Sequence, residues 1–131
     1  MPHAITCLSL RGLLMIDAAT CALMGVGLIT ASQPLGGMLE VPAALLFWAG
    51  VALPPTAAFM VISAAARPAP GWAVSVIVLG NVLWVLGSLL APAIGAFSPN
   101  ALGWVFLAGQ AAAVAVLAKL EFDAASCFDR Q

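Results

Sequence analysis

Four long apolar stretches, separated by short segments rich in Pro and Gly, constrain the fold of this chain more than any other feature. They cover residues 11–31, 42–65, 72–95 and 101–120. About 20 helical residues, at about 1.5 Å each, cross the hydrocarbon layer of a bilayer. The α-helix satisfies its own backbone polar groups there. We therefore expect an all-α membrane fold, a bundle of four transmembrane helices.

The composition agrees with this expectation. Of the 131 residues, 64% are hydrophobic and 7% are charged, whereas a soluble domain carries about 25% charged residues. The formal net charge of -1 provides no basic field that would attract nucleic acid. We expect a single integral membrane domain over residues 1–131, in contact with the lipid bilayer, with residues 121–131 as a polar cytoplasmic tail.

The first stretch also admits a signal-peptide interpretation, with small residues near a cut after Ala31. Two features argue against cleavage. Asp17 falls inside the apolar region, and Ile29 is a poor residue three positions before the cut. We interpret this stretch as a true first span.

The cations predict the orientation. Every Lys and Arg of the chain falls on one side of a four-span topology: Arg11, Arg67, Lys119 and Arg130. Cytoplasmic loops carry an excess of Lys and Arg. Both termini are therefore expected to face the cytoplasm, with the protein integral to the inner membrane.

The second stretch contains the pair Pro54-Pro55. Proline lacks the backbone N–H, so the carbonyls of Gly50 and Val51 lose their helical donors. Because the bilayer core offers no water as a substitute, we expect a kink in this span.

Each span carries polar side chains within the apolar layer. Asp17 lies about 9 Å from the cytoplasmic end of its span, while Asn81 and Gln110 both lie about 14 Å in. Polar groups in hydrocarbon turn inward and pair, so we predict one polar layer facing the bundle axis. The candidate residues of this layer are Asp17, Thr20, Cys21, Thr56, Asn81, Trp84 and Gln110.

Asp17 has two interpretations. A carboxylate inside a span is a functional hypothesis by default, and proton-coupled carriers use such a group to exchange a proton for a cation. Alternatively, Asp17 pairs with a snorkelling Arg11 or Lys119 and only holds helices together. For Asn81 and Gln110 the structural interpretation is interhelical hydrogen bonding, worth about 0.6 kcal/mol per bond.

Motifs of enzymatic chemistry are missing from the sequence. There is no H-E-x-x-H, no Gly-rich phosphate loop and no histidine in any span. Cys7, Cys21 and Cys127 have neither C-x-x-C spacing nor an even number. We expect no enzyme activity, no cofactor and no metal site.

An internal regularity suggests a parallel pseudo-repeat of two helix pairs. Asp17 precedes the segment Pro34-Leu35-Gly36 by 17 residues, and Asn81 precedes Pro99 by 18. The first and third spans would run in the same direction, as a parallel repeat requires.

Several short motifs resemble a group of small four-span bacterial integral membrane proteins known only as uncharacterised. They are Ile16-Asp17-Ala18, Asn81 to Trp84, Pro99 followed by Ala101-Leu102-Gly103, and Gln110-Ala111. The resemblance covers about residues 10–120. It implies a four-helix membrane bundle and supplies no activity. Small multidrug exporters share four spans and an acid in the first, but only as an architectural analogy.

Two functions follow as hypotheses. The first is a non-catalytic membrane component that packs its helices against another membrane protein or against a second copy of itself. The second is a minimal, dimeric, proton-coupled carrier of small molecules, in which Asp17 is the exchanging carboxylate and Asn81, Gln110 and Trp84 line the site.

Overall fold

The computed structural model describes residues 9–66 and 69–129. Within them the chain forms four helices, each long and apolar enough to cross a membrane. The helices are α2 (Leu10–Leu39), α3 (Ala43–Ala65), α4 (Gly71–Ala93) and α5 (Ala101–Asp129). The predicted all-helical architecture with four apolar helices is confirmed.

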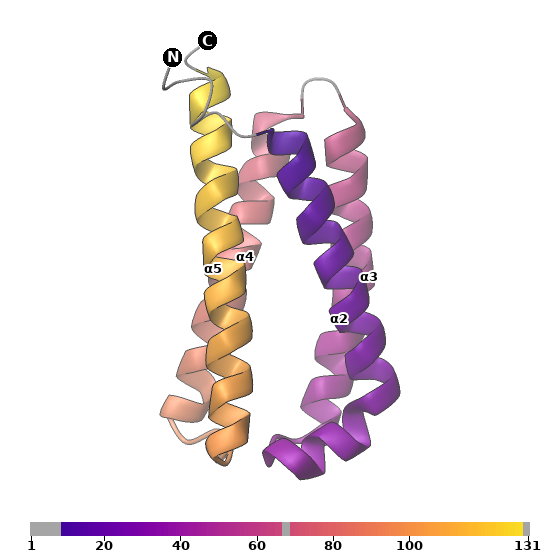
Figure 1. Cartoon of the computed structure of the whole chain (residues 1–131), viewed down its shortest axis with the longest axis vertical. Helices are drawn as coiled ribbons and strands as arrows, with labels where there is room; N and C mark the ends of the chain where they lie inside the picture. The colour runs from indigo at the N-terminus through magenta and orange to yellow at the C-terminus, as the bar shows by residue number, and fades with distance from the viewer. Residues whose placement is uncertain (1–8, 67–68, 130–131) are drawn as a thin grey trace.

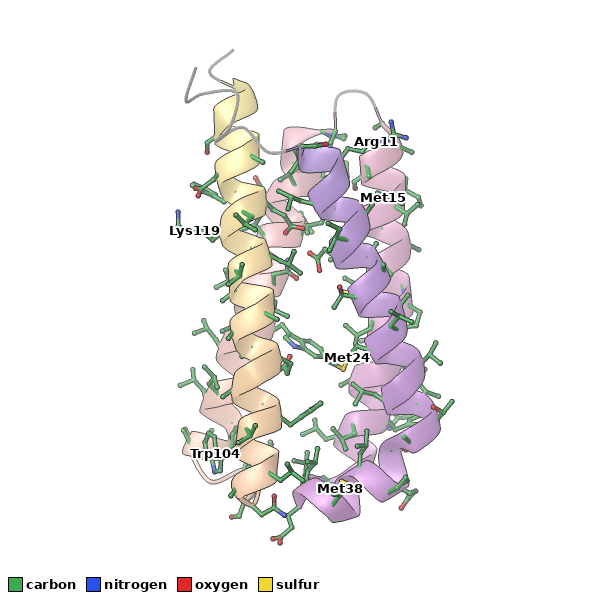
Figure 2. The ribbon with its side chains drawn as sticks, in the orientation of Figure 1. Arg11, Met15, Met24, Met38, Trp104 and Lys119 are labelled. Carbon is green, nitrogen blue, oxygen red and sulfur yellow. The ribbon has the colours of Figure 1, made fainter. Side chains whose placement is uncertain are left out.

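The helices form two hairpins that lie side by side (Figure 1). α2 packs mainly against α3, and α4 packs mainly against α5. Between the hairpins, α2 contacts α5. The backbones of α3 and α4 come close at few positions, and the rings of Phe59 and Trp72 lie 6.1 Å apart between them. The start of α2 and the end of α5 lie at the same end of the bundle (Figure 1). Arg11 and Lys119 lie toward this end, and Met38 and Trp104 lie at the opposite one (Figure 2).

The first hairpin is held by close backbone contact between two glycines. A Cβ atom at Gly25 would lie 3.0 Å from the Gly50 carbonyl oxygen, and one at Gly50 would lie 3.0 Å from the Gly25 oxygen. Small residues let helix backbones approach this closely. The Gly50 carbonyl, which Pro54 leaves without a helical donor, thus faces the backbone of α2.

The break in helical geometry lies in α2 and not at Pro54-Pro55. Ala31 has φ -116° and ψ 20°, three residues before Pro34, while α3 runs through both prolines as one continuous helix. The ring of Pro34 clashes with the carbonyl of Thr30, and Ala31 absorbs the distortion. Beyond this break the helix resumes and includes Gly36 and Gly37, which the sequence pattern places in a loop.

The last helix also extends further than predicted. α5 continues nine residues past Leu120, to Asp129, through a segment expected to be a tail. No Gly or Pro follows Gly109 in the sequence, so nothing interrupts the helix. Lys119 and Asp123 form an i,i+4 ion pair at 2.8 Å on its outer face, which supports the helix slightly.

Asn100 joins the hairpins at the end distant from the start of α2. Its side-chain oxygen accepts from the Gly103 backbone N–H at 2.8 Å and so caps α5. Its amide nitrogen donates to the Met38 carbonyl at 2.9 Å, and its backbone N–H donates to the Leu39 carbonyl at 3.2 Å. Gly103 packs directly against the Leu39 carbonyl, leaving no space for a Cβ atom.

Candidate functional site

A buried cluster of two acids and one amide joins the hairpins toward the end of the bundle where α2 begins and α5 ends. The Asn81 side-chain nitrogen donates to Asp17 Oδ2 at 2.9 Å and to Glu121 Oε1 at 3.1 Å. The relative exposures of Asp17, Asn81 and Glu121 are 1%, 7% and 0%. We call these three residues the acid–amide cluster. It connects α2, α4 and α5 through side chains that belong to three separate helices.

Helical spacing directs these side chains inward. On α2, Leu14 and Ala18 are buried on either side of Asp17; on α5, Ala118 and Ala124 are buried one turn before and after Glu121. Residues three and four apart share a helix face. The polar groups therefore sit within apolar stripes that face the other hairpin.

Glu121 is the member of the cluster that the sequence pattern missed. It lies one residue beyond Leu120, the predicted end of the last span, in the segment predicted to be a polar tail. Its signal is the apolar face it shares with Leu117 and Ala124 and the absence of a helix breaker after Gly109. A charged residue can occupy the buried face of a membrane helix when a hydrogen-bond partner lies opposite it in the bundle.

Of the two interpretations of Asp17, the ion pair with Arg11 or Lys119 is wrong. Lys119 instead binds Asp123, with 74% of its side chain exposed, and it points away from the bundle (Figure 2). Arg11 is exposed. Cations snorkel outward because water solvates them at little cost, so Asp17 takes a neutral amide as its partner.

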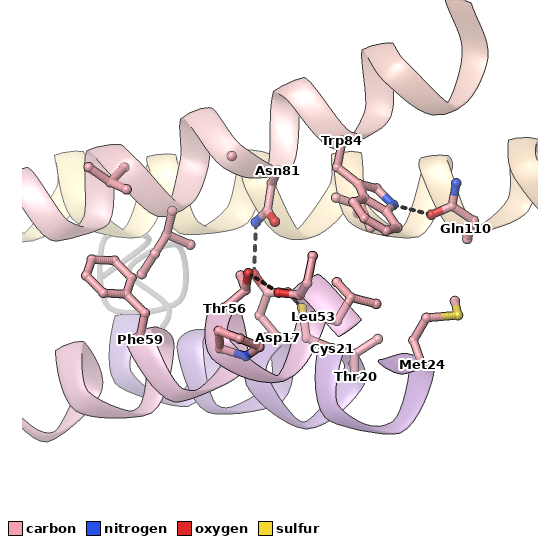
Figure 3. A pocket seen from close by; sticks show the side chains of 16 residues that line it. Asp17, Thr20, Cys21, Met24, Leu53, Thr56, Phe59, Asn81, Trp84 and Gln110 are labelled. Carbon is pink, nitrogen blue, oxygen red and sulfur yellow. Dashed lines mark hydrogen bonds between the residues drawn. The ribbon is translucent and has the colours of Figure 1, made fainter. Parts of the chain in front are cut away.

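A cavity of about 420 Å³ lies next to the acid–amide cluster, between the two hairpins. Its walls are mainly apolar side chains of all four helices, and exposed residues of α3 and α4 line its rim, among them Thr56 and Gly80. All seven predicted polar-layer residues line this cavity: Asp17, Thr20, Cys21, Thr56, Asn81, Trp84 and Gln110 (Figure 3).

The hydrogen bonds divide these residues into three groups. Thr20 and Thr56 donate to carbonyls of their own helices, at 2.8 Å to Ile16 and 2.9 Å to Ala52. The Cys21 thiol lies 3.7 Å from Asp17 Oδ1 and donates to it. Asp17 is the only charged side chain that lines the cavity. The Cys21 thiol and the Asn81 amide are its hydrogen-bond donors.

Trp84 and Gln110 form a separate pair between the hairpins, further from the start of α2 than the acid–amide cluster. The indole N–H of Trp84 donates to Gln110 Oε1 at 2.6 Å (Figure 3). On α5, Gln110 lies 11 residues from Glu121, about 16 Å along the helix. The polar side chains thus occupy two levels rather than one layer.

This second pair separates the first cavity from another. A cavity of about 310 Å³ lies on its far side, lined almost wholly by apolar side chains such as Leu28, Leu46 and Phe106. Met24, Trp84 and Gln110 line both cavities. Met24 points into the space between the hairpins (Figure 2). The three side chains form a partition across the interior of the bundle.

Among the described residues, no three His, Cys, Asp or Glu side chains are grouped so that they could hold a metal ion. The cavity has one carboxyl group, that of Asp17, at the edge of mainly apolar walls. Such a cavity suits a small apolar molecule with one polar or cationic end, because few convergent polar groups in apolar walls are typical of ligand sites.

No protein family, curated protein or solved structure matches this chain. The resemblance to small four-span membrane proteins therefore stays a prediction. Function must be inferred from the geometry of the chain itself.

Proposed function

We propose that this chain is a minimal proton-coupled carrier, and that the cavity beside the acid–amide cluster is its substrate site. One observation carries the proposal: Asp17 is 1% exposed and lines a cavity of about 420 Å³ inside the bundle. Ionisable residues within membrane spans mark substrate and ion pathways. Under this proposal the chain is not an enzyme, because the site only binds and releases.

The charge of the wall favours a cationic substrate. Asp17 is the only charged residue that lines the cavity, and Arg11 and Lys119 are on the outside of the bundle. The face of Trp84 adds an aromatic surface on which a desolvated cation is attracted by about 0.5–2 kcal/mol. An anion would meet no positive side chain in this wall.

The rim of the cavity favours access from the side. The backbones of α3 and α4 come close at few positions, and the lining includes exposed residues of both helices: Pro55, Thr56, Val76 and Gly80. In a membrane this rim faces lipid, so an amphipathic molecule would reach Asp17 directly from the bilayer. We place the protein in the inner membrane with both termini cytoplasmic, because its cations favour that orientation.

Uptake of quaternary ammonium ions by proteoliposomes tests the proposal. Vesicles with an acidic lumen are given labelled ions from tetramethylammonium to phenyltrimethylammonium. Outward proton flow should drive uptake of at least one of them. Asp17→Asn should reduce uptake about tenfold or more, because a lost charged hydrogen bond is worth about 1.5–3 kcal/mol.

Thr30→Val is the control. The Thr30 hydroxyl bonds the Val26 carbonyl of its own helix at 2.8 Å, and Thr30 does not line the cavity, so the variant should keep most of the uptake. Uptake that is no faster than in protein-free vesicles across the whole series contradicts the carrier, and so does equal uptake by wild type and Asp17→Asn.

A second candidate is a non-catalytic component that packs against another membrane protein or a second copy of itself. The observation that favours it is the same opening between α3 and α4, since a partner helix placed there would complete the bundle. In that case Asp17→Asn lowers stability or assembly, and neither the wild type nor the variant transports ammonium ions. We also propose that the two hairpins are related as a parallel pseudo-repeat and that the carrier is a dimer.

A further inference from the structure

Asp17 and Glu121 meet at one shared donor. Asp17 Oδ2 and Glu121 Oε1 both accept from the single Asn81 amide nitrogen, at 2.9 and 3.1 Å, so the two buried carboxyl groups are neighbours. Two negative charges this close repel strongly in a buried site, because the protein interior screens them less than water does. The geometry therefore already limits the charge of the pair.

Neutral groups surround the pair on every helix. α3 and α4 carry no Asp, Glu, Lys, Arg, His or Cys. On α2 the facing titratable group is the Cys21 thiol, 3.7 Å from Asp17 Oδ1, and Arg11 is exposed. On α5, Lys119 binds Asp123 on the outer face. Among the described residues, no cation balances two negative charges, and burial costs several kcal/mol per uncompensated ion.

One oxygen of the pair has no partner. Glu121 Oε2 is buried and is the only such side-chain N or O atom without a hydrogen-bond partner in the described part of the chain. Leaving a buried polar group unpaired costs about 1–3 kcal/mol, and more for a charged group. Asn81 cannot supply the missing donor, because both hydrogens of its amide are directed to Asp17 and Glu121.

We propose that Asp17 and Glu121 form a proton-binding site that holds one proton between their carboxyl groups. The proton converts an oxygen–oxygen repulsion into an O–H···O bond and supplies the donor that the pair lacks. The cluster then carries one negative charge, which two Asn81 hydrogens and the Cys21 thiol stabilise. The proton is the ligand of this site, and Glu121 is as necessary to it as Asp17.

The role of this proton in transport rests on the proposed function, but its presence does not. When a monovalent cation reaches Asp17 from the cavity, the O–H bond of the pair breaks and the proton leaves to water. The cluster changes from one negative charge to two, and the cation restores the net charge of the occupied site to minus one. One cation thus replaces one proton.

Infrared spectroscopy of the purified protein in lipid tests the site without any substrate. A protonated carboxyl has a carbonyl band that carboxylates lack and that shifts in deuterium oxide. Wild type at neutral pH should show such a band with the intensity of one carboxyl. Glu121→Gln and Asp17→Asn should each abolish it, because an amide N–H replaces the proton and the remaining acid becomes a carboxylate. Asp123→Asn, on the outer face of α5, should leave it unchanged.

Absence of the band in the wild type overturns the proposal. Survival of the band in either single variant overturns it as well, since the proton would then belong to one residue and not to the pair. If the variants do not fold, labelling the wild type with ¹³C in its Asp and Glu carboxyls still decides, because the band must shift. A positive infrared result together with absent ammonium uptake would refute the carrier and keep the proton site.

Discussion

Asn81 on α4 donates a 2.9 Å hydrogen bond to Asp17 on α2, across 64 residues of sequence and between the two hairpins. The same nitrogen reaches Glu121 on α5. At the far end of the bundle, Asn100 and Gly103 hold α5 against the end of α2. The hairpins are therefore joined at both ends, and the two cavities lie between these joints.

Asn81→Leu should destabilise the bundle. The substitution leaves both buried carboxyl groups without their shared donor, and an unpaired buried polar group costs about 1–3 kcal/mol. Thermal unfolding in detergent, followed by circular dichroism, measures the loss. Ser88→Ala on the same helix is the control, because the Ser88 hydroxyl bonds only the carbonyl of Trp84 in its own helix. Equal melting temperatures for Asn81→Leu and wild type would refute the role of Asn81 as a joint.

Gly103→Ala should weaken the opposite joint. A Cβ atom there would overlap the Leu39 carbonyl and lie 2.7 Å from Pro99 Cβ, and overpacking costs about 1–3 kcal/mol. Gly109→Ala on the same helix is the matched control, since a Cβ atom at Gly109 meets nothing within 4 Å. Helix propensity favours that control by about 0.5–1 kcal/mol. A Gly103→Ala protein that melts as high as Gly109→Ala would contradict the contact.

Gly50→Ala should open the first hairpin. Its Cβ atom would lie 2.8 Å from Leu28 Cβ and 3.0 Å from the Ile29 nitrogen, so α2 and α3 must separate. A lower melting temperature and wider spin-label distances between α2 and α3 are expected. Gly27→Ala, on the open side of α2, should change neither. Unchanged distances in Gly50→Ala would show that the helices cross elsewhere.

Trp84→Phe should weaken the partition between the cavities. The variant removes the indole donor and leaves Gln110 Oε1 without it, a loss of about 0.5–1.5 kcal/mol for a typical hydrogen bond. Trp48→Phe is the same substitution at a side chain that is 66% exposed and should be nearly neutral in the same melting assay. If both variants melt alike, the Trp84–Gln110 bond contributes nothing to stability.

The helices were predictable because their signal is local. An apolar run of 20 or so residues identifies a span wherever it occurs. Asp17 and Asn81 were also recognisable, because a polar group inside such a run stands out and must turn inward. Glu121 was not recognisable in this way, because an acid that follows an apolar run resembles the start of a polar tail. In the structure, burial of Ala118 and Ala124 shows that the inward face of α5 continues past Glu121.

Which polar groups pair depends on how the helices are placed relative to one another. The depth of a residue, counted along its own helix, does not give that placement. By depth, Gln110 appeared level with Asn81, but Asn81 binds Glu121, 11 residues further along α5, and Gln110 binds Trp84. The kink was misplaced for a related reason. In α3, Pro54 packs against Gly25 and the helix stays continuous, while Pro34 disrupts α2 at Ala31.

Native mass spectrometry tests the central claim most directly, on wild type and Asp17→Asn protein extracted gently from the membrane in which they were made. If the cavity beside Asp17 is a carrier site, the wild type retains a small bound molecule and Asp17→Asn releases it. A wild type without any small adduct, bound instead to another membrane protein in fixed ratio and equally so in Asp17→Asn, would contradict the carrier and establish the packing function.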